Sequence, residues 1–147
     1  MTLEIVSQFS DWHHILFKVK DADISLRFYS EYLGLAAVVD QKDMEGNRWV
    51  WMRFLENPHA PLVVLTEDSQ WKKSDQAVET SFQRMGFRLN DLEPVEEISE
   101  RAKKENCLVE PAHYGGHLRG YYCVVVDPDG NLLEFSYFVS PKGGSAF

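Results

Sequence analysis

The chain has 147 residues, 44% of them hydrophobic and 13% aromatic, which is the composition of one compact folded domain and not of a disordered chain. Its formal net charge of −8 argues against nucleic acid and against an anionic membrane surface as partners, because both favour basic patches. The charge is compatible with ordinary solubility and with attraction of cationic ligands. No basic stretch precedes an apolar run at the N-terminus, and no apolar segment is long enough to span a bilayer, so we expect a cytoplasmic protein.

The first half of the sequence predicts a strand, a helix and three more strands. Apolar and polar residues alternate weakly over residues 12–20, which indicates the first strand. Asp21 or Asp23 can cap the helix that follows, since a short carboxylate accepts the free N–H groups of a first turn. Gly34 ends that helix, because glycine tolerates the positive φ of a C-terminal cap. Further strands are expected at about 35–40, 47–55 and 61–67.

The second half repeats this order. After a strand at 84–90, Pro94 suits the first turn of a helix, where the N–H that proline lacks is not needed. The segment Asp127-Pro128-Asp129-Gly130 has the residues of a tight hairpin turn. We therefore expect one domain over residues 1–147, made of modules at about 12–67 and 82–138 with a linker at 68–81. The strands of the second half are expected at about 107–111, 118–126 and 131–138.

An offset of 70 residues relates the two halves. It maps Phe17-Lys18-Val19-Lys20-Asp21 onto Phe87-Arg88-Leu89-Asn90-Asp91, and it maps Trp51-Met52 onto Tyr121-Tyr122 without a gap. A fixed period is the signature of a duplicated unit, and two copies of this length predict two half-domains that face each other. Strand–helix–three strands in each half gives an α+β fold with a mixed sheet, whose free face can curve around a ligand.

Three segments of the chain resemble the vicinal oxygen chelate superfamily, which includes glyoxalase I, extradiol dioxygenases, and fosfomycin and bleomycin resistance proteins. The resemblance covers residues 12–138 and implies a glyoxalase-like fold of two βαβββ modules forming a cup-shaped mixed sheet. It also implies a homodimer. The segments that carry it are His14-x-x-Phe17-x-Val19-x-Asp21, Ser25-x-x-Phe28-Tyr29-x-x-x-Leu33-Gly34-Leu35 and Asp127-Pro128-Asp129-Gly130-Asn131-x-x-Glu134-Phe135.

The same resemblance implies four inward positions that hold the metal in metal-dependent members. The motifs place two of them at His14 and Glu134, and the offset of 70 places the other two at Arg84 and Val64. A guanidinium stays protonated and valine has no donor atom, so one imidazole and one carboxylate remain. A tight divalent site generally has three or more protein ligands, so we expect no metal and no other cofactor.

Several side chains can complete the predicted cavity. Glu134 lies in an apolar strand and needs a partner, which can be a metal, a cationic ligand or, as we favour, a bidentate pair with Arg84. Lys18 and Arg88 are equivalent in the repeat and share the inward face, where they either capture an anionic group or are solvated at the sheet edge. His13 should point to the opposite face from His14.

Other residues leave more than one interpretation open. His113 and His117 flank Tyr114-Gly115-Gly116, which is either a lid or a simple connection. We expect Cys107 and Cys123 to be small buried apolar groups, because their spacing suggests neither a disulfide framework nor a zinc site.

The sequence therefore predicts a protein that binds a small aromatic ligand in a cup-shaped cavity without a catalytic metal. The cavity residues are expected to be His14, Val64, Arg84, Glu134, Lys18 and Arg88. The alternative is a metal-dependent lyase, transferase or dioxygenase with a degenerate site that uses His14 and Glu134 and needs a divalent metal. Whether the protein is an enzyme stays open, and the sequence does not identify the ligand.

Overall fold

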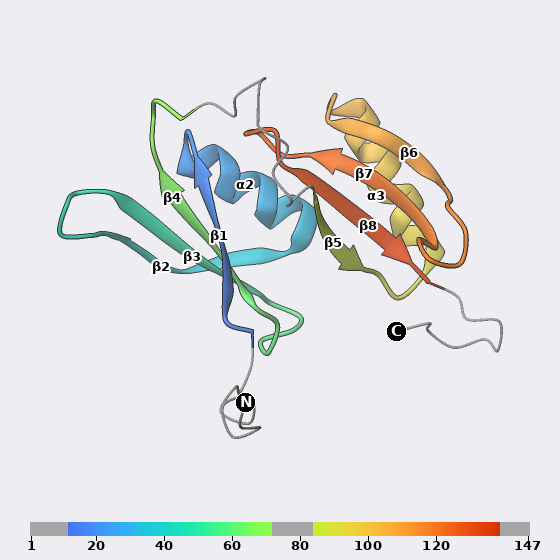
Figure 1. Ribbon diagram of the computed structural model, residues 1–147, viewed down its shortest axis with the longest axis horizontal. Coiled ribbons are helices and arrows are strands. Elements are labelled where there is room, and N and C mark those ends of the chain that lie inside the picture. Colours follow the sequence, from blue (N-terminus) through green and yellow to red (C-terminus); the bar gives the residue numbers. More distant parts are fainter. Residues whose placement is uncertain (1–11, 72–83, 139–147) are drawn as a thin grey trace, which may run out of the picture. The chain divides into compact units, whose positions relative to one another are not determined.

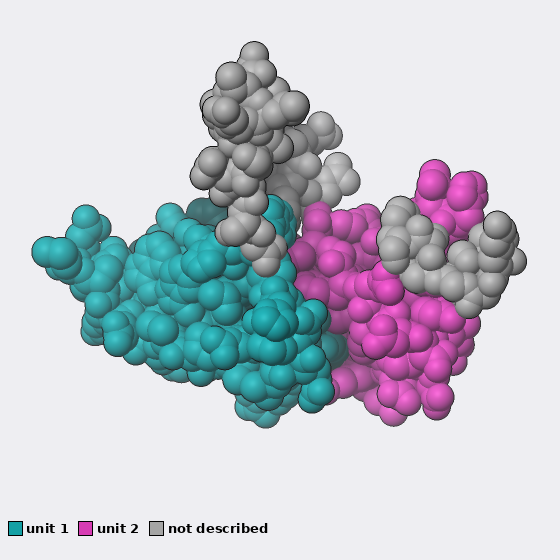
Figure 2. All heavy atoms as spheres, turned by 90° about the horizontal axis from the view of Figure 1, so that it is seen from below, with its two compact units in different colours: residues 1–71 teal, residues 72–147 magenta. Residues whose placement is uncertain are grey.

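The computed structural model describes residues 12–71 and 84–138. The chain divides into two compact units, residues 1–71 and residues 72–147 (Figure 2). Within these described residues, each unit has one strand, one helix and three more strands, in the predicted βαβββ order (Figure 1). The expected linker at 68–81 begins with described residues as far as Trp71, and the rest of it lies outside the described residues.

Unit 1 is a four-stranded mixed sheet with α2 on one face (Figure 1). The strand order is β1-β4-β3-β2, with β1 parallel to β4 and the other neighbours antiparallel. We call the face opposite to α2 the helix-free face of unit 1. The elements are β1 (His14–Val19), α2 (Ala22–Leu33), β2 (Leu35–Lys42), β3 (Arg48–Phe54) and β4 (Leu62–Glu67).

Both predicted boundaries of α2 are confirmed. The Asp21 carboxylate accepts the backbone N–H of Asp23 at 2.9 Å and that of Ile24 at 3.1 Å, so it is the N-cap. Gly34 ends the helix with φ 64°, in the left-handed region that glycine adopts without strain. Because β2 starts directly after this cap, α2 is held against the sheet.

Unit 2 repeats the architecture with strand order β5-β8-β7-β6, in which β5 and β8 are parallel (Figure 1). The Asp91 carboxylate accepts the backbone N–H of Leu92 at 2.7 Å and caps α3, with Pro94 in its first turn as predicted. The face of this sheet opposite to α3 is the helix-free face of unit 2. The elements are β5 (Arg84–Arg88), α3 (Leu92–Lys104), β6 (Leu108–Tyr114), β7 (Tyr121–Val126) and β8 (Leu132–Tyr137).

The hydrophobic core of each unit lies between its helix and its sheet. In unit 1, Phe17 on β1 stacks on Tyr29 of α2 with ring centroids 6.2 Å apart. In unit 2, the thiol of Cys123 donates to the Val95 carbonyl oxygen of α3 at 3.7 Å. Cys123 is fully buried as expected, whereas Cys107 is only half-buried, so the prediction for Cys107 is wrong. None of the described helices is long and apolar enough to cross a membrane.

The offset between the modules is 70 at their ends but not in their middle. The strand β4 spans residues 62–67 and β8 spans residues 132–137, as the offset requires. In the central strands, however, Trp51 lies opposite Val64 and Val124 lies opposite Glu134, which is an offset of 73 between residues 51 and 124. The predicted equivalence of Trp51 with Tyr121 is therefore wrong.

The lengths of the connections explain this shift of three. Helix α3 has 13 residues against 12 in α2, and residues 105–107 separate it from β6 where Gly34 alone separates α2 from β2. The turn at 127–131 is shorter than the loop at 55–61 and restores the offset at β8.

Candidate functional site

The helix-free face of unit 2 carries a cluster of paired charges. Arg84 on β5 donates from Nη1 to Oε1 of Glu134 on β8 at 3.2 Å, and the same nitrogen lies 3.8 Å from Oε2 of Glu110. Arg119 donates from Nη2 to the same Oε1 of Glu134 at 3.4 Å. The predicted pairing of Glu134 with Arg84 is confirmed. Its predicted bidentate geometry is wrong, because two arginines share one oxygen of this half-buried carboxylate.

Arg119 was missed by the sequence interpretation. It lies in the turn between β6 and β7, where strand alternation gives no indication of side-chain direction. Its guanidinium lies over the ring of Tyr122 at 4.2 Å from the centroid. The turn is tightly packed, since a Cβ on Gly115 would come within 2.5 Å of the Tyr122 ring and one on Gly120 within 2.5 Å of the Tyr137 carbonyl oxygen. An arginine among three glycines was the signal available in the sequence.

The two histidines near this turn differ from each other. His113, which was expected in a loop, lies on β6, and its Nδ1 donates to the Pro111 carbonyl oxygen at 2.7 Å. Its ring centroid is 4.6 Å from that of Tyr122. His117 is exposed in the turn itself. Of these two, His113 alone belongs to the face that holds Glu134, because it is the register partner of Tyr122, itself the partner of Ser136.

The helix-free face of unit 1 combines imidazole and indole rings. The register Leu16–Val64 places His14, two residues before Leu16, on the same face as Val64, and Trp51 lies opposite Val64. The His14 and Trp51 ring centroids are 4.9 Å apart. Val64 is fully buried in this row and offers no donor atom.

The prediction that His13 points away from His14 is wrong. The Nδ1 atoms of the two imidazoles are 2.8 Å apart, so one donates and the other accepts, and the His13 ring centroid is 5.6 Å from that of Trp51. His13 precedes the first residue of β1, so strand alternation does not apply to it.

Lys18 lies on β1 of unit 1 and Arg88 on β5 of unit 2, each near the end of its strand. The Lys18 ammonium lies 5.3 Å from the centroid of the Trp71 ring, as a cation over an aromatic face. Arg88 is exposed at the end of β5. That His14, Val64, Lys18, Arg84, Arg88 and Glu134 line one cavity stays a prediction.

A shallow groove of about 280 Å³ runs over the β2–β3 hairpin on the helix-free face of unit 1. Trp49 donates from its indole N–H to Oδ2 of Asp43 at 3.0 Å, which fixes the ring orientation. The backbone N–H of Asn47, with Trp49 and Glu45 as further donors, holds the pKa of the Asp43 carboxyl below its usual value. The residues that line the groove are Val39, Gln41, Lys42, Asp43, Trp49 and Trp51.

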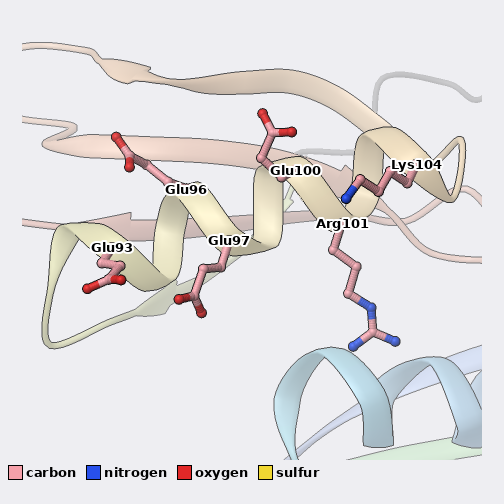
Figure 3. Close-up of a pocket in the computed structure, with 6 residues that line it drawn as sticks. All are labelled: Glu93, Glu96, Glu97, Glu100, Arg101 and Lys104. Carbon is pink, nitrogen blue, oxygen red and sulfur yellow. The ribbon is translucent and has the colours of Figure 1, made fainter.

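A larger groove of about 480 Å³ lies along the solvent side of α3 (Figure 3). Its carboxylates stand in the first turns of the helix and its cations in the last, which is the usual arrangement around a helix dipole. None of the six residues is a predicted site residue, so we interpret this groove as a solvated helix face. They are Glu93, Glu96, Glu97, Glu100, Arg101 and Lys104.

The family model of the Glyoxalase/Bleomycin resistance protein/Dioxygenase superfamily matches residues 12–135, which is most of the chain. The chain belongs to this superfamily. A relative at 28% identity over 124 residues, covering 84% of this chain and 86% of its own, is the uncharacterised protein PA2024 of Pseudomonas aeruginosa.

Solved structures show the same fold. A glyoxylase/bleomycin resistance protein/dioxygenase domain from Frankia sp. EAN1pec has a TM-score of 0.73 at 20% identity and covers 91% of this chain and 96% of its own. A variant of the fosfomycin resistance protein FosX of Listeria monocytogenes, complexed with Mn(II) and 1S,2S-dihydroxypropylphosphonic acid, has a TM-score of 0.65 at 18% identity. It covers 88% of this chain and 93% of its own.

A solved structure with this fold thus holds Mn(II), and the donors that this chain offers are fewer. Within residues 12–71 and 84–138, no group of three or more His, Cys, Asp or Glu side chains is placed to hold an ion. The carboxylate at the predicted ligand position, Glu134, accepts from two guanidiniums that keep their protons. The Cys123 thiol faces α3, where it donates to the Val95 carbonyl oxygen. Burial, and to a smaller extent the negative charge of Glu134, raises the pKa of Cys123 to about 12, so this thiol stays protonated.

Proposed function

We propose that this member of the glyoxalase superfamily binds a small aromatic ligand in a cavity lined by the helix-free faces of its sheets, without a catalytic metal. The observation that carries this proposal is the pair of arginines on Glu134, at 3.2 Å for Arg84 and 3.4 Å for Arg119. A divalent cation at Glu134 would be repelled by two permanent positive charges. The indole and imidazole rings of unit 1 supply surfaces on which a planar ligand can stack.

The proposed cavity residues are the four strand positions and the two cations nearer the strand ends, that is His14, Val64, Arg84, Glu134, Lys18 and Arg88. We propose this small ligand as the partner of the protein. We propose neither a nucleic acid nor a membrane as a partner. We also propose a cytoplasmic location, which the free thiols of Cys107 and Cys123 support, because free thiols are usual in a reducing compartment.

The alternative is a metal-dependent lyase, transferase or dioxygenase whose metal is held by His14 and Glu134. The FosX variant with Mn(II) favours this alternative only through its fold, which this chain shares at 18% identity. Its metal would have to bind Glu134 beside two guanidiniums, whose permanent positive charges oppose a divalent cation.

The test is a screen of small aromatic ligands by NMR, carried out once with EDTA and once with Mn(II), Zn(II) or Ni(II) in excess. We expect a set of ligands whose affinity is the same in all samples. Binding that appears only with added metal, and disappears on Glu134→Ala, would establish the alternative. If no aromatic ligand binds under any condition, the proposed function is wrong.

A further inference from the structure

Strand register shows that the helix-free face of unit 1 is free of strand carboxylates, although the whole chain carries a net charge of −8. The strands β2 and β4 have two carboxylates in unit 1, Asp40 and Glu67, and both belong to the other face. Asp40 accepts from Arg48 at 2.8 and 2.9 Å, and Glu67 accepts the backbone N–H of Ala22 at 2.8 Å. Net charge is therefore a poor guide to the ligand that this face prefers.

The central strand of this face presents two indoles and then a guanidinium. Trp49, Trp51 and Arg53 alternate along β3, and the register pairs Gln41 with Trp49, Val39 with Trp51 and Ala36 with Arg53. The irregularity in this pairing adds a residue to β2 and leaves β3 regular, so the three side chains share one face.

Arg53 has no partner in the part of the chain that the structure describes. Its side chain is exposed, and no ion pair or hydrogen bond involves it within residues 12–71 and 84–138. This separates it from Arg48 on the other face, which is tied to Asp23 and Asp40. Two residues along a strand are about 6.6 Å apart, so the Arg53 guanidinium can reach a group on a ligand that stacks on Trp51.

The end of the groove that lies away from Arg53 carries Lys42 and Asp43. The Asp43 carboxylate there already accepts N–H groups from Glu45, Asn47 and Trp49 at 2.9, 2.9 and 3.0 Å. The residues that line the groove thus put Lys42 and Asp43 at one end and Trp49 and Trp51 in the middle, and Arg53 lies outside the lining, two residues beyond Trp51 on the same face. The groove volume of about 280 Å³ is at the lower limit of ligand pockets, about 300–1,000 Å³, and suits one or two fused rings.

We propose that this groove binds a planar aromatic ligand with a carboxylate or similar anionic group, whose rings stack on Trp49 and Trp51 and whose anion pairs with Arg53. This inference rests on the proposed function and specifies the ligand class, an aromatic anion and not the cation that a net charge of −8 suggests. A guanidinium recognises a carboxylate through parallel N–H donors, and it is more easily desolvated than an ammonium.

Three probes of one shape and different charge test the proposal: 2-naphthoate, 2-naphthalenemethanol and 2-naphthylmethylammonium. Each is titrated into the protein, and the indole N–H signals of Trp49 and Trp51, assigned from Trp49→Phe and Trp51→Phe, are followed by NMR. We expect naphthoate to bind about tenfold tighter than the alcohol, because a charge-assisted hydrogen bond contributes about that factor, and the ammonium to bind most weakly.

A matched pair of charge variants assigns the effect. Arg53→Gln should make naphthoate bind as weakly as the alcohol and leave the alcohol unchanged. Arg27→Gln removes the same charge from the exposed side of α2, where Arg27 pairs with Glu31 at 3.1 Å, and should change naphthoate binding less than about twofold.

The inference fails if naphthoate and the alcohol bind unmodified protein equally, or if both arginine variants weaken naphthoate alike. In either case the groove still binds an aromatic ring, so the proposed function stands. If none of the probes shifts the Trp49 or Trp51 signals, the groove is not a ligand site and the inference is overturned. The broader metal-independent screen then decides the proposed function separately.

Discussion

At the scale of single residues, Glu134 is the side chain on which the account depends. It occupies the strand position where the resemblance implies a metal ligand, yet its Oε1 accepts from Arg84 and Arg119. Arg84 Nη1 also lies 3.8 Å from Glu110 Oε2, an atom that is buried without a hydrogen bond. Arg84 thus lies between two carboxylates and forms an ion pair with each.

Replacing Arg84 by methionine should lower the free energy of unfolding by about 1–2 kcal/mol, because Glu134 loses a hydrogen-bond donor and Glu110 loses an ion-pair partner. Urea denaturation measures this change. The control is Lys103→Met, which removes the same charge from an exposed position on α3 of the same unit. It should lower the free energy of unfolding by less than about 0.5 kcal/mol. Equal effects of the two substitutions would show that the Arg84 contacts contribute no stability.

Arg48 should make the stability of unit 1 depend on pH. Its hydrogen bonds lower the pKa values of Asp40 and Asp23 below the ordinary value of 3.8. Carboxyls with lowered pKa contribute stability that is fully present above about pH 5 and is lost as the pH falls through their folded-state pKa values. We expect the unfolding free energy to fall between pH 5 and pH 3 by less in Arg48→Met than in the unmodified protein, as measured by urea denaturation across that range. Identical slopes would contradict this role of Arg48.

At the scale of elements, the sequence predicts the ends of each module better than its middle. Capping by Asp21 and Gly34 and the place of Pro94 in the first turn of α3 follow from local chemistry, and the structure shows them as expected. The central strands depend on the lengths of the connections, which a gap-free offset of 70 does not include. A shift of three residues, being an odd number, moves a strand side chain to the other face of the sheet. Tyr121 therefore lies on the face that carries α3 and donates to Glu96, whereas Trp51 lies on the helix-free face beside His14.

The same limit applies to the candidate site. Strand alternation places Arg84 with Glu134 and His14 with Val64, because all four lie on regular parallel pairs. Arg119 and His13 lie outside strands, and their side-chain directions depend on packing that no periodicity encodes. Arg53 lies on a regular strand, so its direction can be predicted. Its lack of a carboxylate partner becomes clear only when all the charges on the helix-free face are compared.

In the β6–β7 turn, Gly120 should tolerate substitution less well than Gly116. Gly120 has φ 68° and its Cβ position is 2.5 Å from the Tyr137 carbonyl oxygen, whereas Gly116 has φ 92° with nothing within 4 Å. Gly116→Ala should cost about 1 kcal/mol of unfolding free energy from backbone strain alone. Gly120→Ala should cost at least about 1 kcal/mol more, since the turn must also move. Equal costs in thermal or urea denaturation would contradict the close packing of Gly120.

For the whole molecule, the expectation that concerns assembly is a homodimer. The resemblance to the superfamily implies a homodimer, and twofold dimers are the most frequent oligomers. We therefore expect light scattering to give twice the chain mass of 17.0 kDa. A stable monomer at high protein concentration would contradict this expectation, and it would leave the contacts of Glu134 unaffected.

We propose that the residues at the implied ligand positions, Arg84 and Val64 above all, prevent this protein from binding a metal. The direct measurement is elemental analysis of the protein after incubation with excess zinc or nickel and removal of free ions. We predict no stoichiometric metal in the unmodified protein and about one equivalent in Arg84→His with Val64→Glu and Arg119→Met, which supplies four donors and removes both guanidiniums from Glu134. About one equivalent in the unmodified protein, lost on Glu134→Ala, would contradict the account and establish the metal-dependent alternative.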